Sequence, residues 1–307
     1  MKIAVIGAGA MGSIYGGILS RKNEVYLIDT NETLVEEIRR NGLRLQEGET
    51  ENRYFPKAAV SAEKIGTADL VILFVKALFS RAALKANKAL IGPDTYVMTL
   101  QNGSGHEEVL EEFVPKERMI IGTTEDNGAV LGLAYVRRGG AGNTNVGMLA
   151  EDGEGFLPRL KESFEACGFH VRIHGNIQQL IWNKLFTNVS LSAVTGVLQA
   201  EIGYVYRNPH AWNMALSLLH EAVQVAHAIG IQADEEMLAE KIKEVSVQSP
   251  HGITSICADI RGGRLTEVDT ISGSVVRAAK KAGIPVPVHE FVVNMIHGLE
   301  EREKSDG

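Results

Sequence analysis

Three glycines near the N-terminus have the spacing of a turn that binds a pyrophosphate. They are Gly7, Gly9 and Gly12, within the run Gly7-Ala8-Gly9-Ala10-Met11-Gly12. The first glycine permits a tight turn, the second lets the backbone approach phosphates, and the third lets a helix pack closely on a strand. An apolar run precedes this turn and a helical pattern follows it, as a dinucleotide site requires. We therefore expect the three glycines, Ala10 and Met11 to contact a dinucleotide cofactor; the alternative is a glycine turn that only packs a strand on a helix.

A carboxylate follows the next predicted strand. Asp29 lies 17 residues after Gly12, where an acid can accept hydrogen bonds from the adenosine ribose hydroxyls. A 2′-phosphate at that place would meet a like charge, and two unit charges about 4 Å apart interact by about 4 kcal/mol at an effective dielectric near 20. Asp29 therefore favours NAD(H). In the alternative interpretation Asp29 only caps the next helix, although Thr30 and Asn31 could also do so.

A stripe of polar side chains runs along a segment that is otherwise apolar. In Gln178–Leu198 the polar residues are four, four and three positions apart, which puts them on one helix face: Lys184, Asn188, Ser192 and Thr195. A lysine among buried-type residues either extends along the surface to reach water or lines a cleft. The amide and hydroxyl companions favour a cleft.

Further along, Ser255 and Asp259 are four residues apart on a short predicted helix that stops at Gly262-Gly263. A new helix is predicted to start with Thr266 as N-cap and Asp269 at the third position, as in a capping box. Glu267 would then be the first helical residue. An acid in a first turn is favourable simply because the helix dipole is positive there, so its position alone does not indicate catalysis.

Alternating strands and helices must position the glycine turn. Four short apolar or β-branched runs predict strands: Ile3–Ile6, Glu24–Ile28, Asp69–Val75 and Thr95–Leu100. Ala77–Leu90 has a helical pattern between the last two strands, and Gly103–Phe113 follows the last strand as another candidate helix. Such alternation predicts a doubly wound parallel sheet of the Rossmann type.

The character of the chain changes twice after these strands. Between Met119 and Ala150, short β-like runs separated by glycines predict additional antiparallel strands on the same sheet: MIIGTT, LAYVRR and NTNVGMLA. From about Asn176 onward nearly every segment has helical spacing. We therefore expect two domains, a dinucleotide-binding α/β domain at 1–174 and an all-α substrate and catalytic domain at 175–307.

Composition excludes several classes of protein. The net charge is −7 and no basic cluster appears, which argues against nucleic acid or an anionic membrane surface as a partner. The only cysteines, Cys167 and Cys257, are far apart and form neither a disulfide framework nor a four-cysteine metal site, so we expect no metal and a reducing cytoplasm. The N-terminal apolar run is too short for a signal peptide or a membrane span. Oligomeric state stays open, with a homodimer as one option.

Taken together, these and other motifs resemble the ketopantoate reductase (2-dehydropantoate 2-reductase) family over nearly the whole chain. The motifs are the glycine turn, Val75-Lys76-Ala77, Gln101-Asn102-Gly103-Ser104-Gly105, Trp182-Asn183-Lys184-Leu185 to Asn188, Ser255 through Thr266-Glu267-Val268-Asp269, and Gly283-Ile284-Pro285-Val286-Pro287. The resemblance implies a Rossmann domain followed by an all-α domain of the 6-phosphogluconate-dehydrogenase-like type. It also implies NADP(H)-dependent reduction of the C2 ketone of 2-dehydropantoate to (R)-pantoate, on the route to pantothenate and coenzyme A.

The same resemblance implies roles for individual residues. Lys184 corresponds to the general acid, and Glu267 to an acid that holds the substrate and positions that lysine. Asn102 matches an asparagine at the nicotinamide edge that also contacts substrate, and Lys76 a cofactor-side lysine. The substrate-contacting positions are Asn188, Ser192 and Ser255.

Two departures from the family pattern bear on specificity. The family commonly has an arginine just past the second strand to pair with the 2′-phosphate of NADP, whereas this chain has Asp29-Thr30. Ser192 stands where some members have a second asparagine, so pocket size or substrate choice can differ.

Three rival functions remain at this stage. A β-hydroxyacid dehydrogenase shares the glycine turn and the lysine, but its Asp-Ala-Pro-Val substrate motif has no counterpart here. A reductase of another 2-oxo acid would use the same residues. A dinucleotide sensor, which is not an enzyme, would need neither Lys184 nor Glu267.

Overall fold

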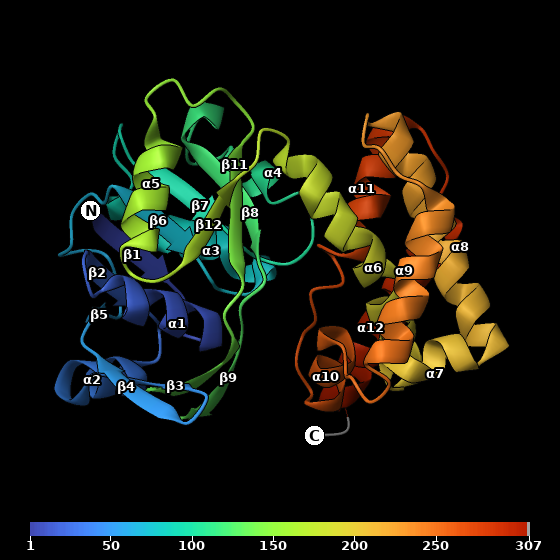
Figure 1. Ribbon diagram of the computed structural model, residues 1–307, viewed down its shortest axis with the longest axis horizontal. Helices are drawn as coiled ribbons and strands as arrows, with labels where there is room; N and C mark the ends of the chain where they lie inside the picture. The colour runs from blue at the N-terminus through green and yellow to red at the C-terminus, as the bar shows by residue number, and fades with distance from the viewer. Residues whose placement is uncertain (306–307) are drawn as a thin grey trace. The chain divides into compact units, whose positions relative to one another are not determined.

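The computed structural model describes residues 1–305, which divide into two compact units (Figure 1). The first unit comprises Met1–Gln101 and His106–Ile177, and the second comprises Asn102–Gly105 and the chain from Gln178 onward. The division thus falls three residues after the expected boundary of 174 and 175, and it assigns the short segment Asn102–Gly105 to the helical unit.

An eight-stranded sheet forms the centre of the first unit. Its order is β12 (His170–Ile173), β11 (Asn143–Met148), β8 (Met119–Thr124), β7 (Tyr96–Thr99), β6 (Leu70–Leu73), β1 (Lys2–Ile6), β2 (Glu24–Ile28) and β5 (Lys57–Ala59). The strands from β8 to β5 run parallel, while β11 is antiparallel to β8. The chain winds outward from β1 in both directions, which is the doubly wound Rossmann-type arrangement predicted from the sequence.

Helix α1 (Ala10–Leu19) is enclosed by two sheets, and this explains why it is rich in glycine. A Cβ on Gly16 would lie 3.1 Å from Leu27 of the large sheet, and a Cβ on Gly17 would lie 2.9 Å from Leu43 of a second sheet. Eight of the ten residues of α1 are buried. A helix that is apolar all round is stable only when it is covered in this way.

The second sheet has four strands and was not foreseen. Its order is β4 (Thr50–Tyr54), β3 (Leu43–Glu47), β10 (Tyr135–Gly140) and β9 (Asn127–Gly132). The expectation that LAYVRR extends the large sheet is therefore wrong, because β10 pairs with β9 and β3 instead. The expectation that MIIGTT adds an antiparallel strand is also wrong, since β8 is parallel to β7; NTNVGMLA does supply the antiparallel strand β11.

Two predicted helices of this unit are shorter than expected. Ala77–Leu90 is interrupted, and forms the 3₁₀ turn η1 (Ala77–Phe79), α3 (Ser80–Ala86) and the 3₁₀ turn η2 (Lys88–Leu90). The interruption falls at Asn87, whose buried amide oxygen accepts the N–H of Ala62 at 3.0 Å. Gly103–Phe113 yields only α4 (Glu107–Leu110), because Gly103 and Gly105 adopt φ of 96° and 83°, outside the helical region. The remaining elements are α2 (Glu32–Asn41), η3 (Lys116–Arg118) and α5 (Phe156–Glu165).

The second unit is helical, as predicted, and has a hydrophobic core of its own. Its helices are α6 (Ile177–Leu198), α7 (Ile202–Arg207), α8 (Pro209–Ala228), α9 (Glu235–Gln248), α10 (Ser255–Arg261), α11 (Ser272–Ala282) and α12 (Pro287–Ser305). On α6 the side chains of Trp182, Leu185 and Phe186 are buried in this core. The core thereby fixes which face of α6 carries Lys184.

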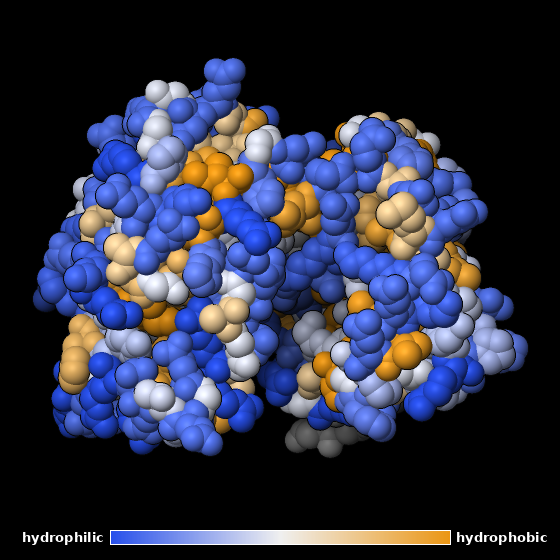
Figure 2. Space-filling view, viewed as in Figure 1, coloured by the Kyte–Doolittle hydropathy of each residue, from blue (hydrophilic) through white to orange (hydrophobic). Residues whose placement is uncertain are grey.

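Hydrophilic residues cover most of the face presented in Figure 2, with hydrophobic ones scattered among them. Within the described part of the chain, no helix combines the length and apolar character needed to cross a bilayer.

Candidate active site

The glycine turn has the geometry that its sequence predicts. Gly7 adopts φ of 100°, and a Cβ there would lie 2.7 Å from the backbone nitrogen of Val75. A Cβ on Gly12 would lie 1.8 Å from the carbonyl oxygen of Gly7, so neither position tolerates a side chain. By contrast, a Cβ on Gly9 would meet nothing within 4 Å, which leaves open space beside the turn.

Helix α1 starts at this turn without a side-chain cap. The first N–H groups of a helix have no intrahelical partner, and the helix dipole makes this end attractive to anions. The open space at Gly9 and the uncapped amides of Ala10 and Met11 therefore fit the pyrophosphate of a dinucleotide.

Asp29 ties the glycine turn to the end of β2. One carboxylate oxygen accepts the N–H of Ala8 at 2.8 Å, and the other accepts the N–H of Asn31 at 3.0 Å. Asn31, not Asp29, caps α2, because its side-chain oxygen accepts the N–H of Leu34 at 3.0 Å. Asp29 is half-buried, and each of its oxygens keeps a further lone pair. It can therefore accept hydrogen bonds from ribose hydroxyls as well.

A pocket of about 400 Å³ opens beside Asp29. It is lined by Ala8, Gly9, Ser13, Asp29, Asn31, Leu34, Val130 and residues 132–136. Among these described lining residues Asp29 is the one charged side chain. The pocket thus suits the uncharged hydroxyls of a ribose better than a phosphate.

Lys76 lies beyond β6, on the loop that packs against Gly7. It is half-buried and precedes η1, where its carbonyl oxygen accepts the N–H of Phe79 at 2.8 Å. The placement is at the carboxyl edge of the parallel strands, on the same unit as the glycine turn.

Gln101 is a positioning residue to which the sequence analysis gave no role. Its side chain donates to the carbonyl oxygen of Val75 and to Oγ of Ser80, and its amide oxygen accepts from Thr99 Oγ1 at 2.7 Å. Gln101 thereby joins the carboxyl ends of β6 and β7 immediately before Asn102. A glutamine directly after a buried strand, at the edge where ligands bind, is the signal that could have identified it.

Lys184 and Asn102 are brought together within the helical unit. Nζ of Lys184 donates to Oδ1 of Asn102 at 3.0 Å. Lys184 is half-buried, although Trp182 and Leu185 beside it on α6 belong to the core. The interpretation of Lys184 as a purely surface side chain is therefore weakened, because its ammonium group has a specific partner 82 residues away in the chain.

The backbone after Asn102 is held by the turn that carries Glu267. The N–H of Ser104 donates to the carbonyl oxygen of Thr270 at 2.9 Å. A Cβ on Gly103 would lie 2.0 Å from the same oxygen, so this close approach requires glycine. Asn102 and Glu267 therefore belong to segments that are packed directly on each other.

The rest of the polar stripe on α6 divides into two kinds. Thr195 is fully buried, and its hydroxyl is bonded to Leu191 O at 2.7 Å and to Oγ1 of Thr254 at 2.7 Å, so its role is structural. Asn188 is half-buried, and the Ser192 side chain is 5% exposed with no hydrogen bond to any described residue. Lys184, Asn188 and Ser192 remain as the part of the stripe that can contact a ligand.

Ser255 is exposed at the first residue of α10, and Thr254 caps that helix through the N–H of Cys257.

Glu267 is half-buried but is not the first residue of a helix as predicted, because α11 starts only at Ser272. The residues from Thr266 to Ile271 form turns instead. Oγ1 of Thr266 accepts the N–H of Val268 at 3.1 Å, two residues on, and so no capping box forms.

A buried carboxylate from α12 holds the start of this turn. Glu300 is 8% exposed and accepts the N–H of Thr266 at 2.6 Å. Its other oxygen pairs with Nδ1 of His297 at 2.9 Å, and Nε2 of His297 faces Asp269 at 3.2 Å. Partial burial favours the neutral ring, but the two carboxylates outweigh it and raise the pKa of His297. Glu300 and His297 had not been identified from the sequence.

Two sequence profiles cover most of the chain. The profile described as "Ketopantoate reductase PanE/ApbA" matches residues 3–151, and "Ketopantoate reductase PanE/ApbA C terminal" matches residues 176–300. The chain belongs to the ketopantoate reductase family. It is accordingly an oxidoreductase of that family, with an NAD(P)-binding Rossmann-like domain.

Relatives named 2-dehydropantoate 2-reductase match over almost their full length. The 2-dehydropantoate 2-reductase of Streptococcus pyogenes serotype M6 is 28% identical over 302 residues, and 98% of each chain is covered. The enzyme of the same name from Pyrococcus horikoshii is 30% identical over 303 residues, again with 98% of each covered.

Solved structures of two kinds resemble this chain. A ternary complex of D-mandelate dehydrogenase with NADH and anilino(oxo)acetate has a TM-score of 0.90 and 30% identity, with 99% of each chain covered. The PanE/ApbA family ketopantoate reductase from Ralstonia eutropha has a TM-score of 0.89 and 27% identity, with 99% of this chain and 100% of that chain covered.

Proposed function

We propose that the protein reduces the C2 ketone of 2-dehydropantoate to (R)-pantoate in the cytoplasm, as a step toward pantothenate and coenzyme A. The observation that carries the proposal is the pairing of Lys184 Nζ with Asn102 Oδ1 at 3.0 Å on an otherwise apolar helix. A half-buried ammonium group held by an amide is a proton donor in a defined position.

The cofactor residues fit a nicotinamide dinucleotide. The uncapped start of α1 and the space at Gly9 would hold its pyrophosphate, Asp29 its adenosine ribose, and Lys76 would lie on the cofactor side. When bound, the nicotinamide supplies a hydride to the substrate carbonyl carbon.

The helical unit supplies the remaining chemistry. As the carbonyl oxygen becomes an alkoxide, Lys184 stabilises its negative charge and gives it a proton, while Asn102 keeps the ammonium group oriented. Glu267 helps to hold the substrate and to position the lysine. Asn188, Ser192 and Ser255 offer amide and hydroxyl groups to the substrate's own hydroxyl and carboxylate.

NADH is the preferred cofactor in this proposal, although NADP(H) is the expectation from family resemblance. The carboxylate of Asp29 and the lack of any Lys or Arg among the described residues that line the pocket support NADH. A 2′-phosphate would meet the charge of Asp29 with no cation from that lining to offset it.

A second candidate is the reduction of another 2-oxo acid, such as an aryl 2-oxo acid. The resemblance to a structure of D-mandelate dehydrogenase with NADH and anilino(oxo)acetate supports it. Ser192 supports it as well, because its hydroxyl has no hydrogen bond to any described residue and its side chain is shorter than that of asparagine.

One assay tests both candidates. NADH and NADPH absorbance is followed with 2-dehydropantoate, phenylglyoxylate and a series of aliphatic 2-oxo acids. The proposal predicts the highest kcat/KM for 2-dehydropantoate with NADH. A higher value for phenylglyoxylate would establish the second candidate, and cofactor binding without turnover of any of these acids would indicate a dinucleotide sensor.

A further inference from the structure

The pocket beside Asp29 has a wall that the Rossmann strands do not supply. Val130, Gly132, Leu133 and Ala134 line it from the tip of the β9–β10 hairpin, which belongs to the second sheet. The opposite wall consists of the glycine turn, Asp29 and the start of α2. A loop more than 100 residues away in sequence therefore faces the residue expected to hold the ribose.

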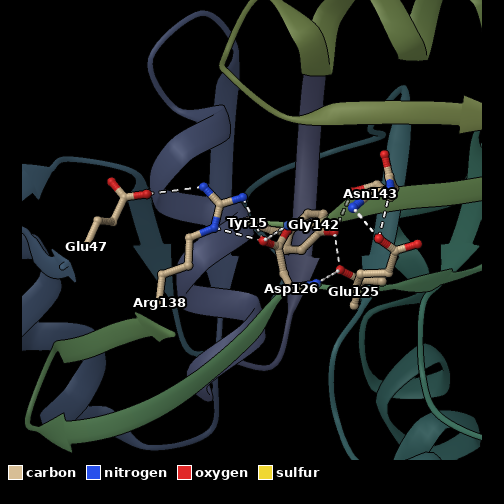
Figure 3. A network of polar contacts seen from close by, with 9 residues as sticks. Tyr15, Glu47, Glu125, Asp126, Arg138, Gly142 and Asn143 are labelled. Carbon is tan, nitrogen blue, oxygen red and sulfur yellow. Dashed lines mark hydrogen bonds and ion pairs between the residues drawn. The ribbon is translucent and has the colours of Figure 1, made fainter. Parts of the chain in front are cut away.

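A buried ion pair anchors the base of this hairpin (Figure 3). The side chain of Arg138 on β10 is 7% exposed; its Nη2 lies 2.7 Å from Asp126 Oδ1, and its Nη1 lies 3.1 Å from Glu47 on β3. Asp126 directly precedes β9 and also accepts the N–H of Gly142 at 3.1 Å. Separating the charges of a buried ion pair is costly in free energy, because each charge would be left buried without a partner. These contacts therefore hold both strands of the hairpin in register.

The same network reaches α1. Tyr15 of α1 belongs to the network drawn in Figure 3, and its hydroxyl lies 2.9 Å from Thr124 and 2.6 Å from Thr144. On β9, a Cβ on Gly128 would lie 2.4 Å from the side chain of Ile14, so this strand packs directly on α1. The hairpin is thus fixed to the helix that opens the glycine turn.

The hairpin tip is also held. The carbonyl oxygen of Ala134 accepts the N–H of Arg44 at 2.8 Å, and the guanidinium group of Arg44 lies 4.2 Å from the centre of the Tyr135 ring. Ala134 adopts φ of 48°, a conformation that costs a non-glycine residue energy and that the surrounding contacts maintain.

At this tip two apolar side chains border the pocket without being covered. Val130 is 61% exposed and Leu133 is 48% exposed. Ligand pockets are lined mainly by apolar side chains, and a ligand seated in this pocket would cover both of these. An adenosine suits this pocket, since its base has apolar faces and its ribose hydroxyls can donate to Asp29.

We propose that the β9–β10 hairpin tip is a wall of the adenosine site, and that Val130 and Leu133 cover the adenosine of a dinucleotide without a 2′-phosphate. The inference rests on the proposed function only in that the ligand is a nicotinamide dinucleotide. The uncharged tip leaves Asp29 as the charge that a 2′-phosphate would meet.

Binding of ADP-ribose to the full-length protein, measured by isothermal titration calorimetry, tests the proposal. Leu133→Ala and the double variant V130A/L133A should each weaken binding about tenfold or more, which corresponds to about 1.4 kcal/mol of lost apolar contact. The matched control is Leu131→Ala, because Leu131 is 42% exposed on the same hairpin but does not line the pocket. Unchanged affinity in both Leu133 variants would overturn the proposal, as would an equal loss in the control.

A second experiment tests whether a cation at the hairpin tip improves binding of a 2′-phosphate. Leu133→Arg places a cation beside Asp29 and should lower the ratio of the Kd for 2′-phospho-ADP-ribose to the Kd for ADP-ribose at least tenfold, whereas Leu131→Arg should leave it unchanged. If Leu133→Arg and Leu131→Arg have the same ratio of the two Kd values, the hairpin tip is not a wall of the adenosine site. These titrations contain no 2-oxo acid, so the absence of turnover would refute the proposed reaction without affecting them.

Discussion

Asp29 combines two tasks in one carboxylate. Its hydrogen bonds to the N–H groups of Ala8 and Asn31 fix the glycine turn relative to the end of β2, and Asp29 also lines the pocket. In the proposed function, its charge would disfavour a 2′-phosphate, and its hydrogen bonds would hold the turn that binds the cofactor.

Asp29→Asn should reverse part of the preference for NADH. The amide removes the charge that opposes a 2′-phosphate, but only one of its two atoms can still accept a backbone N–H. We expect kcat/KM for NADH to fall roughly tenfold, and the ratio of NADPH to NADH kcat/KM to rise about ten- to a hundredfold, equivalent to about 1.4–3 kcal/mol. Steady-state kinetics with both cofactors measures this.

Glu32→Gln is the matched control for that change. Glu32 is an exposed acid three residues further on, in the first turn of α2, and it does not line the pocket. The control should keep the wild-type ratio. If both variants keep it, Asp29 does not select the cofactor.

Sequence spacing predicts residues that act through local geometry. The glycines and Asp29 lie where the motif requires them, because a turn between adjacent elements is encoded within about 25 residues. The partners of the proposed catalytic segment are different. Glu300 accepts a hydrogen bond from Thr266, which is 34 residues away in the sequence, and no local sequence pattern predicts such a contact.

At the scale of elements, the turn from Thr266 to Ile271 connects α12 to the Asn102 segment. Glu300 accepts the N–H of Thr266, and Thr270 in turn accepts the N–H of Ser104. Hydrogen bonds from Thr266 and His297 outweigh the effect of burial and lower the pKa of Glu300, which keeps it ionised. The turn that carries Glu267 is therefore positioned by a charge on another helix.

Glu300→Ala should impair substrate binding more than cofactor binding. Loss of the carboxylate leaves the N–H of Thr266 buried without its acceptor, at a cost of about 1–3 kcal/mol in the free energy of unfolding. We expect the KM for the 2-oxo acid to rise about tenfold while the Kd for ADP-ribose stays the same. Glu300→Gln, which can still accept the N–H of Thr266, should restore part of the KM.

Glu290→Ala is the control on the same helix, because Glu290 is exposed on α12. It should change neither the KM nor the Kd. Equal rises of the KM in the Ala and Gln variants of Glu300 would show that the hydrogen bond to Thr266 does not position the turn.

Elements bounded by local signals were predicted more accurately than those defined by distant pairing. The strand expected at Glu24–Ile28 is observed with those bounds as β2. The second sheet was missed because β3 pairs with β10, about 90 residues away, and both are short strands of mixed polarity. Only tertiary pairing distinguishes such strands from loops.

At the scale of the whole molecule, each unit has its own core, and the helical core contains one unusual buried group. His289 on α12 is fully buried; its Nε2–H donates to the carbonyl oxygen of Leu218 at 3.0 Å, and its Nδ1 has no partner among the described residues. Burial lowers the pKa of His289 to about 4. Between pH 6.5 and about 4, His289 is therefore neutral in the folded protein but protonated in the unfolded chain.

This difference in the protonation of His289 predicts that acid lowers the free energy of unfolding. Below the unfolded pKa of 6.5 the unfolded chain binds the proton and the folded chain does not, so stability falls as the pH decreases from about 7 to 4. At pH 5 the contribution of His289 is a loss of about 2 kcal/mol relative to pH 7.5. Urea unfolding followed by tryptophan fluorescence reports on the correct unit, because Trp182 and Trp212 both belong to it.

His289→Gln provides the comparison, since glutamine does not titrate and its amide can still donate toward Leu218. The variant should lose about 2 kcal/mol less than the wild type between pH 7.5 and pH 5. An equal loss in both proteins would mean that other groups cause the acid sensitivity.

Fold class was predictable at this scale because it depends on periodicity summed over long stretches. Alternating strand and helix patterns gave the doubly wound sheet, and helical spacing from about residue 176 gave the helical unit. The assignment of Asn102–Gly105 to the helical unit was not predictable, because it rests on the close contact of Gly103 with Thr270.

In the proposed reaction, Lys184 delivers the proton during reduction of a 2-oxo acid. The most direct test of this role is the turnover of Lys184→Ala with saturating NADH and substrate, beside Lys241→Ala as a control at an exposed lysine of the same unit. We expect a fall in kcat of about 10²–10⁴ for Lys184→Ala, with the Kd for ADP-ribose unchanged and full activity in the control. Turnover of Lys184→Ala close to that of the wild type would contradict this role.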